Sequence, residues 1–274
     1  MNILVVTSEY LHLAKVGGLA DAVTGQAEGL AARGHSVTVV LPKYRGINTD
    51  AFQRDPQPLH VDLGNGTYGC AVLERELKGV QIRLIEHEDL FRRDGVYGPT
   101  PADAFADNLT RFALLSRGAL EIAARTDRPV DILHVHDWPA GLGVIWLQTH
   151  YRESAAFSAV KTVLSIHNLG FQGNFSTDEA RDVLGIPNDE AEDIGITDAG
   201  GINILKGAIH ASDRIVTVSP TYATEIQQPR YGFGLHAVLQ LRAPRLHGIL
   251  NGIDTGIWNP DTDHYIPARY DVEN

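Results

Sequence analysis

The chain has 274 residues, of which 43% are hydrophobic, so it is long enough for one large domain or two small ones with a packed core. Its formal net charge of −11 argues against a nucleic-acid or anionic-membrane surface, because both require a basic face. Cys70 is the single cysteine, which excludes an intrachain disulfide and fits a reducing compartment. No apolar run approaches the ~20 residues of a membrane span, and the first residues lead into an apolar segment rather than a signal peptide. We therefore expect a cytoplasmic protein.

Apolar segments typical of strands alternate with helical patterns along most of the chain. We expect strands at residues 2–8, 36–41, 131–135, 162–166, 214–218 and 246–250. We expect helices at residues 18–33, 103–125, 140–149, 203–211, 222–227 and 235–241. This alternation predicts an α/β fold, namely a Rossmann-like, doubly wound parallel sheet with helices on both faces.

The segment from residue 59 to residue 85 has a different pattern. Three short strands are expected there, at Leu59–Leu63, Tyr68–Leu77 and Val80–Ile85, with turns at Asn65-Gly66 and Lys78-Gly79. This pattern predicts an antiparallel β meander inserted at one edge of the sheet. Residues 91–102 should form a loop and residues 169–200 a loop-rich segment with short helices, while the helix at 103–125 should turn its charged side chains away from the core.

The motif Lys15–Asp21, with the sequence Lys-Val-Gly-Gly-Leu-Ala-Asp, joins the first expected strand to the first helix. Its glycine pair lets backbone approach a ligand closely, and the free N–H groups and positive dipole of a helix start favour an anion. Lys15 adds a mobile positive charge, so the motif suits the diphosphate of a sugar nucleotide. The alternative is a turn whose glycines only satisfy geometry. A dinucleotide site is disfavoured, because G-x-G-x-x-G is absent and seven residues lie between Ser8 and Val16.

Polar residues follow several of the expected strands. They are Lys15, His136-Asp137, His167-Asn168, Ser219-Pro220 and Asn251-Gly252. In a doubly wound sheet, ligands bind beyond the carboxyl ends of the strands. These residues therefore predict one shared site, and the alternative is that the loops are simply polar because they are exposed.

Several of these motifs, in this order, resemble those of bacterial glycogen synthases and plant starch synthases. The resemblance rests on Lys15–Asp21, Val40–Gly46, His136–Trp138, Ser165–Leu169, Val218–Tyr222 and Leu250–Asp254. It extends over essentially the whole chain. It implies the N-terminal half of a glycosyltransferase B-type fold, whose active site lies in the cleft between two Rossmann-like domains.

The resemblance also implies a reaction. A retaining enzyme of this family transfers glucose from ADP-glucose to the non-reducing end of an α-1,4-glucan, without a metal or cofactor. Lys15, Gly17 and Gly18 would then contact the diphosphate, and His167 would lie beside the anomeric carbon. The backbone carbonyl of His167 is a candidate for stabilising the oxocarbenium charge. The residues leave open whether the donor is ADP-glucose or UDP-glucose, and the resemblance favours ADP-glucose.

Other side chains carry both a functional and a structural interpretation. We expect Asp137 to belong with His167 to the catalytic centre. Asp137 and Asn168 could hydrogen-bond sugar hydroxyls or could cap the turns that follow their strands. Trp138 could stack on a sugar or cover the core, and we favour packing. Asp21 could bind the acceptor or the nucleotide sugar, or could complement the helix dipole.

Two further residues are candidates for substrate binding. Tyr97 lies in a glycine-rich loop and could line the acceptor cleft or could be an exposed loop aromatic. Asn251 could form a turn or could contact the nucleotide near a hinge. The residues alone do not decide between these alternatives.

The pair His134 and His136 could instead bind a metal ion, which would indicate a different class of reaction. In a strand, an H-x-H pattern places both imidazoles on one face, so His134, His136 and Asp137 could be metal ligands. His167 on a nearby strand end could complete the site. A metal-dependent hydrolase is therefore an alternative function. The structural interpretation is that His134 faces helices as a core histidine.

The resemblance also predicts how the chain is divided. Residues 1–255 would form the N-terminal catalytic domain on the acceptor side, and residues 256–274 would form a linker toward a C-terminal domain that the sequence does not contain. That domain would be a partner needed for activity, so the chain alone should bind donor weakly and be nearly inactive. The alternative is a freestanding module that binds a nucleotide sugar or a glucan.

Overall fold

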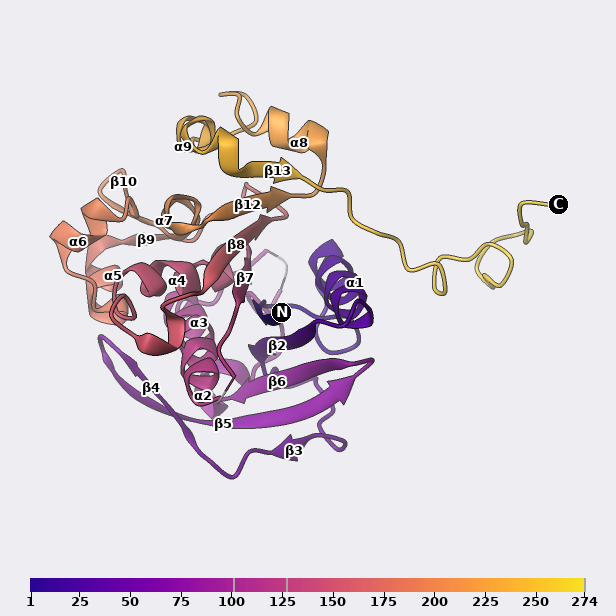
Figure 1. The fold of residues 1–274 in the computed structure, drawn as a ribbon, viewed down its shortest axis with the longest axis horizontal. Helices are drawn as coiled ribbons and strands as arrows, with labels where there is room; N and C mark the ends of the chain where they lie inside the picture. The colour runs from indigo at the N-terminus through magenta and orange to yellow at the C-terminus, as the bar shows by residue number, and fades with distance from the viewer. Residues whose placement is uncertain (101, 127, 274) are drawn as a thin grey trace.

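The computed structural model describes residues 1–100, 102–126 and 128–273, and it is built on a large mixed β sheet (Figure 1). The strand order is β13-β12-β8-β7-β1-β2-β6-β5-β3, with β4 paired to β5. The bounds of these strands are β1 Asn2–Val6, β2 Ser36–Pro42, β3 Gln53–Arg54, β4 Leu59–Leu63, β5 Gly66–Leu77, β6 Val80–Glu86, β7 Ile132–His136, β8 Lys161–Ile166, β12 Arg214–Thr217 and β13 Leu246–Gly248.

Helices cover both faces of this sheet. Their bounds are α1 Gly18–Ala32, α2 Glu88–Phe91, α3 Asn108–Ala124, α4 Asp137–Gln148, α5 Thr177–Leu184, α6 Asn188–Asp193, α7 Ile204–Ala211, α8 Pro220–Glu225 and α9 His236–Leu241. Short 3-10 turns lie at Ala155–Phe157 and Ala243–Arg245. Of the helices in the described ranges, none has both the length and the apolarity that a membrane crossing requires.

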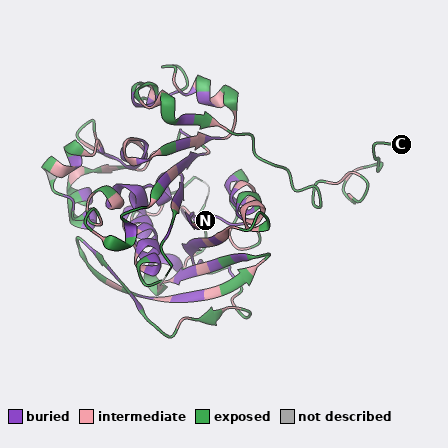
Figure 2. Cartoon of the chain, in the orientation of Figure 1, coloured by how far each residue is buried: buried purple, intermediate pink, exposed green. Residues whose placement is uncertain are grey.

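All neighbouring strands from β13 to β6 pair in parallel, so their carboxyl ends lie at one edge of the sheet. β1 lies at the centre, between β2 and β7. Its apolar side chains alternate between two cores: Leu4 and Val6 join the cluster under α3 and α4, whereas Ile3 and Val5 join the cluster under α1. Figure 2 shows the resulting concentration of buried residues in the central strands and the helices beside them. The expected doubly wound parallel sheet is therefore confirmed.

The local signals for the ends of elements also agree with the structure. α1 stops where Gly34 adopts a φ of +84°, and its N–H donates to the carbonyl of Ala31. Lys78 and Gly79 both have positive φ, as a two-residue hairpin turn requires. The meander is antiparallel between β4, β5 and β6. It lies at one edge of the main sheet, as expected, and is joined to it by the parallel pairing of β6 with β2.

Two expectations for the middle of the chain are wrong in detail. The helix expected from residue 103 begins at Asn108, because Phe105 donates its N–H to the carbonyl of Tyr97 instead of starting the helix. The charged side chains of α3 are not all directed away from the core, since Arg111 is fully buried. Within residues 91–102, the segment expected as a loop, Pro101 lies outside the described residues.

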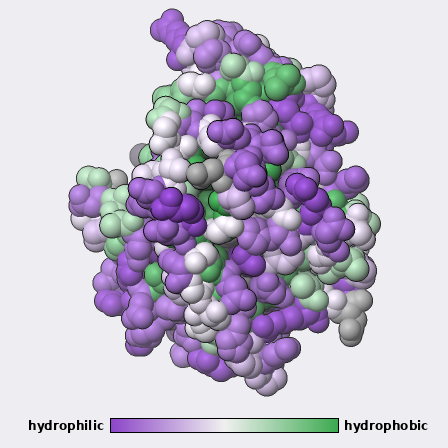
Figure 3. Space-filling view, turned by 90° about the vertical axis from the view of Figure 1, so that its left-hand side faces the viewer, coloured by the Kyte–Doolittle hydropathy of each residue, from purple (hydrophilic) through white to green (hydrophobic). Residues whose placement is uncertain are grey.

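A small antiparallel sheet was not predicted. It consists of β9 Asn174–Ser176, β10 Thr197–Asp198 and β11 Gly201–Asn203, in the order β10-β11-β9. The helices α5 and α6 lie between its strands in the chain, within the segment expected to be loop-rich. These elements lie at the left of Figure 1, and Figure 3 shows the molecule from that side. The surface seen there is largely hydrophilic, with a hydrophobic area toward its upper end.

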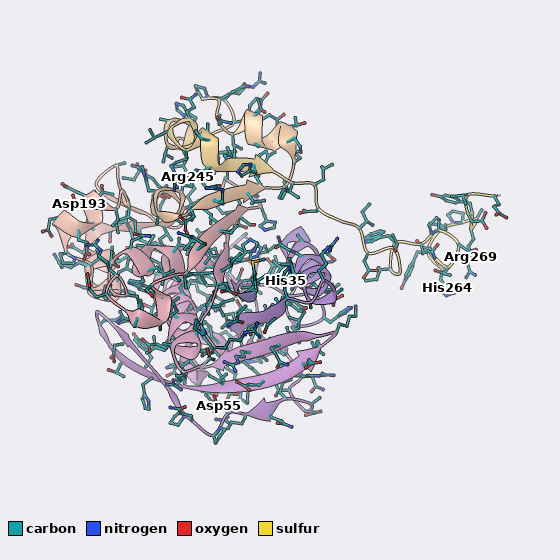
Figure 4. All side chains as sticks on the ribbon, viewed as in Figure 1. His35, Asp55, Asp193, Arg245, His264 and Arg269 are labelled. Atoms are coloured by element: carbon teal, nitrogen blue, oxygen red, sulfur yellow. The ribbon has the colours of Figure 1, made fainter. Side chains whose placement is uncertain are left out.

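The last part of the chain leaves the sheet after β13 and extends away from it (Figure 1). Arg269 hydrogen-bonds His264, and both labelled side chains lie far from the sheet in Figure 4. Tyr265 is 99% exposed. The described part of this segment contains no helix or strand beyond Gly248.

Candidate functional site

Loops from distant parts of the chain meet at the carboxyl edge of the sheet. The carboxylate Oδ1 of Asp137, which follows β7, accepts hydrogen bonds from the backbone N–H groups of His167 at 2.8 Å and Asn168 at 3.5 Å, which follow β8. This contact joins two of the predicted strand-end motifs directly. It exists because β7 and β8 are parallel neighbours, and His136, the last residue of β7, lies in register with Ser165, one residue before the end of β8.

Asp137 has an unusual backbone conformation and environment. It has a φ of +53°, in the left-handed region that most L residues avoid, at the first residue of α4. Burial raises the pKa of its carboxyl to about 7, against the lowering effect of the two backbone N–H groups, and the charge of Glu9 raises it further. A left-handed backbone and a perturbed carboxyl are features that cluster at functional sites in proteins, so they make Asp137 a candidate.

Three histidines form a row beneath this loop. The rings of His134 and His136 stack with centroids 4.3 Å apart, so the H-x-H pattern does place both on one face of β7. Nε2 of His134 hydrogen-bonds the hydroxyl of Ser165 at 2.7 Å, and Nδ1 of His136 hydrogen-bonds Nε2 of His167 at 3.0 Å. The structural interpretation of His134 is therefore confirmed, because its ring is buried in the core and hydrogen-bonded to Ser165.

The row does not have the character of a metal centre. Among the residues that the structure describes, no group of three or more His, Cys, Asp and Glu side chains could hold a metal ion. The ring nitrogens of His136 and His167 that face each other are used in their own hydrogen bond. The metal-dependent hydrolase is consequently not favoured.

The glycine turn is held by a buried carboxylate that the sequence reasoning missed. Oε2 of Glu9 accepts the backbone N–H groups of Val16 at 2.6 Å and Gly17 at 3.0 Å. Oε1 of Glu9 accepts the hydroxyl of Tyr97 at 2.7 Å, and that hydroxyl also contacts the hydroxyl of Ser8 at 2.8 Å. Tyr97 is therefore half-buried and joined to the turn rather than free on the surface. The amides of Val16 and Gly17 are already occupied, so an anion at this helix start has to use other groups.

Lys15 and Asp21 form an ion pair across the first turn of α1. Nζ of Lys15 lies 2.7 Å from a carboxylate oxygen of Asp21, and both side chains are more than 40% exposed. Such a pair adds little to stability because solvent screens it. Both groups are consequently available to exchange partners with a ligand.

A cavity of about 930 Å³ lies between α1 and the segment that follows β13. Its lining includes Asp21 of α1, His167 after β8, and Asn251 after β13. These three predicted residues come from segments that are far apart in the sequence. The structure therefore brings Asp21 in the first turn of α1, the histidine loop and the Asn251 segment to one cavity, whose described lining does not include Lys15, Gly17 or Gly18.

The remaining predicted residues lie nearby in structural roles. Oδ1 of Asn168 accepts the N–H of Gly170 at 3.0 Å, which is the turn-capping role, although the residue itself is exposed. Trp138 is buried and packs edge-on against Phe112, with centroids 5.0 Å apart. Its ring also covers Gly173, where an added Cβ would come within 2.5 Å of the indole. Packing is thus the role that the structure shows for Trp138.

A parallel sheet with polar loops at its carboxyl edge defines the class, a Rossmann-like ligand-binding domain. Comparison with known proteins then identifies the family: the sequence model described as the starch synthase catalytic domain matches residues 2–241. The chain belongs to this family.

Relatives and a solved structure agree with this assignment. The chain is 41% identical over 98% of its length to the glycogen synthase of Treponema denticola, and 40% identical over its whole length to that of Myxococcus xanthus. It spans 55% and 58% of those proteins, about half of their length. The structure titled as the catalytic domain of starch synthase IV from Arabidopsis thaliana bound to ADP and acarbose has a TM-score of 0.87 and 29% identity, over all of this chain and 56% of that one. The expected N-terminal half of a glycosyltransferase B-type fold is thereby confirmed.

Proposed function

We propose that this chain is the acceptor-side half of a retaining glucosyltransferase, which transfers glucose from ADP-glucose to the non-reducing end of an α-1,4-glucan. The matched relatives are named glycogen synthases, and the similar plant structure holds ADP and acarbose. The observation that carries the proposal is the cavity lined by Asp21, His167 and Asn251. It has the size, the position and the polar groups that a sugar nucleotide at a strand-end site requires.

The geometry around Asp137 explains how a carbonyl would be aimed at the reacting carbon. In a trans peptide the C=O of one residue points opposite to the N–H of the next. Because the N–H of Asn168 points to Asp137, the carbonyl of His167 points away from that carboxylate. A carbonyl fixed before the reaction stabilises a developing oxocarbenium charge without reorganising. Asp137 therefore acts by holding the His167 peptide.

The glycine pair supports a ligand at the helix start. Neither Gly17 nor Gly18 has a positive φ, and among the described atoms an added Cβ on either would meet nothing within 4 Å. The fold of this chain consequently does not require glycine at these positions. Close approach of a diphosphate to the amides of Gly18 and Leu19, beside the ammonium of Lys15, gives a reason for both glycines.

The division of the protein is part of the proposal. Residues 1–255 form the domain that carries the site, and residues 256–274 form a linker toward a second domain. The extended course of residues 256–273 and the twofold length of the relatives support this division. The second domain supplies the remaining contacts to the donor when the two halves close on it. The buried thiol of Cys70, free of a disulfide, supports a cytoplasmic setting.

The test is donor binding by calorimetry to the wild type and to Lys15→Ala and Gly18→Ala. Both changes should weaken ADP-glucose binding at least about tenfold, because each removes or blocks a diphosphate contact. Circular dichroism should show unchanged folding, since Lys15 is exposed and Gly18 has open space.

A matched control is Lys161→Ala, which removes the same charge from an exposed position at the opposite, amino end of β8. It should leave binding unchanged. Equal losses in Lys161→Ala and Lys15→Ala would show that only net charge matters and would contradict the assigned site. UDP-glucose, titrated in parallel, decides which nucleotide is preferred.

A further inference from the structure

In the row of imidazoles at the end of β7, the ring of His136 has a fully buried nitrogen without a partner among the described residues. His136 is 1% exposed, and its Nε2 makes no hydrogen bond within the part of the chain that the structure describes. Its other ring nitrogen, Nδ1, is 3.0 Å from Nε2 of His167. The two rings are tilted by 33°, with centroids 5.3 Å apart. His136 thus contacts the predicted catalytic residue through one hydrogen bond and leaves its opposite edge in the core.

A neutral imidazole has one N–H and one nitrogen with a free lone pair. The state of the unpartnered Nε2 of His136 therefore determines which of the two histidines donates the hydrogen bond between them. If His167 donated, His136 would carry its own proton on Nε2 and would bury an N–H with nothing to accept it. If His136 donates, the unpartnered atom is only a lone pair. Orphaned buried N–H groups are rarer and more costly than orphaned acceptors, so the second arrangement is favoured.

The charged alternatives are unfavourable for the same site. Burial lowers the pKa of His136 well below its usual range, and the neighbouring His134 and His167 lower it further. Burial also lowers the pKa of His167 to about 4. Both rings are consequently neutral near pH 7, and each exists as a single tautomer set by its hydrogen bonds.

We propose that His136 is a positioning residue that fixes the tautomer of His167. It donates from Nδ1 to Nε2 of His167, so that His167 carries its proton on Nδ1 and offers a neutral N–H donor to an oxygen of the bound sugar nucleotide. His167 is then held at two points, its peptide by Asp137 and its ring by His136. The tautomer follows from this chain alone, and only the identity of the ligand rests on the proposed function.

The direct test is the protonation state of the His167 ring, measured in ¹⁵N-histidine-labelled protein. Long-range ¹H–¹⁵N correlation spectra distinguish protonated from unprotonated ring nitrogens, and the His167→Gln spectrum assigns the signals. In the wild type near pH 7 we expect the proton on Nδ1 of His167 and on Nδ1 of His136. A proton on Nε2 of His167 would overturn the proposal, and this measurement needs no variant of His136 to fold.

Three variants separate positioning from packing. His136→Phe keeps a planar ring but removes the donor, so His167 should become a mixture of tautomers. His136→Asn retains an amide N–H near the place of Nδ1 and should restore the Nδ1 proton on His167. The matched control is His134→Phe, which removes a buried imidazole that stacks on His136 and bonds Ser165, and which should leave His167 unchanged. An unaltered His167 tautomer in His136→Phe would contradict the role.

Donor binding gives a second, independent readout. His136→Phe should weaken ADP-glucose binding about tenfold, the size of one hydrogen bond, and His136→Asn should recover most of that loss. Equal binding by His136→Phe and wild type would show that the ligand does not use the Nδ1 donor. If the wild type itself fails to bind ADP-glucose, the proposed function fails, whereas the spectra still decide the tautomer.

Discussion

At the scale of single residues, the site is organised around Asp137, whose backbone and carboxyl are both held in unfavourable states. The left-handed φ of +53° is tolerated best by Gly, Asn and Asp. Burial raises the pKa of the carboxyl to about 7. The same carboxylate holds the following strand-end loop by accepting the N–H groups of His167 and Asn168. The strained backbone and the buried carboxyl of Asp137 lower the stability of the fold, while the same side chain fixes the loop after β8.

Asp137→Asn should alter how stability depends on pH. Between about pH 4 and 7 the native carboxyl binds a proton that the unfolded chain has already lost, so the free energy of unfolding of the wild type falls as pH rises through this window. Asparagine keeps the Oδ1 acceptor and the left-handed backbone but has no proton to release. The variant should therefore become more stable relative to the wild type from pH 4.5 to 7.5, roughly, in urea denaturation. The low pKa values of His134 and His136 act in both proteins and cancel in the difference. If the free energies of unfolding of the wild type and of Asp137→Asn changed with pH in parallel, the pKa of this carboxyl would not be raised in the folded protein.

The positions of the site residues at one edge of the sheet could be predicted from the sequence, whereas the hydrogen bonds between them could not. Lys15, Asp137, His167 and Asn251 could be placed at one edge because parallel strands end together. The role of Glu9 could not be predicted, because its bonds to the glycine turn depend on the path of the loop between β1 and α1. One signal was present nevertheless: Glu9 is a carboxylate directly after a buried strand, in the same position as the other candidates.

At the scale of elements, Arg111 of α3 fixes the long loop that carries Tyr97. Its guanidinium donates to the carbonyls of Leu90 at 2.7 Å and Val96 at 2.8 Å, and to the side chain of Asn108 at 2.6 Å. Asn108 in turn donates to the carbonyl of Tyr97 at 2.8 Å. The aromatic ring of Phe105 lies 4.6 Å from the guanidinium carbon. A buried cation therefore replaces the regular hydrogen bonds that this loop lacks.

Arg111→Lys should destabilise the protein although it keeps the charge. One ammonium cannot reach three acceptors held by the flat guanidinium fork, so buried carbonyls lose their donors at a cost of about 2–4 kcal/mol. Urea denaturation measures this loss. The matched control is Arg125→Lys at the exposed end of the same helix, with an expected change within about 0.5 kcal/mol. A similarly small change in Arg111→Lys would show that the fork geometry is unimportant.

Most elements could be predicted because their signals are local. β1 and β2 are apolar runs, and α1 is bounded by Gly17 and Gly34. The β9-β10-β11 sheet could not be predicted, since its strands have two or three residues and no periodicity can be read over such lengths. The late start of α3 also depends on tertiary contacts, namely the bond from Phe105 to the loop at Tyr97.

At the scale of the whole molecule, the proposed site is open on the side from which the chain leaves the sheet. The cavity wall opposite α1 consists of residues 249–258, whose apolar side chains are exposed, such as Leu250 at 72% and Trp258 at 68%. A donor bound there would contact the sheet on one side and solvent on the other. Catalysis needs water to be excluded from the reacting centre.

We therefore expect no elongation by this chain alone. Incubation with ADP-glucose and a maltooligosaccharide should leave the chain-length distribution of the glucan unchanged, because under the proposed division a second domain has to complete the site. The Treponema denticola glycogen synthase, assayed in parallel, serves as the full-length comparison. Measurable elongation by the 274-residue chain would contradict the proposed division into two domains and would favour a complete site within this one.

The central place of β1 has a consequence for synthesis on the ribosome. Residues 2–6 are synthesised before both of their neighbours in the sheet, β2 at residues 36–42 and β7 at residues 132–136, yet they form the middle strand. After β2 has been synthesised, β1 can pair on one side only until the ribosome has also translated β7. That interval is when the nascent chain is most prone to bind chaperones or to aggregate.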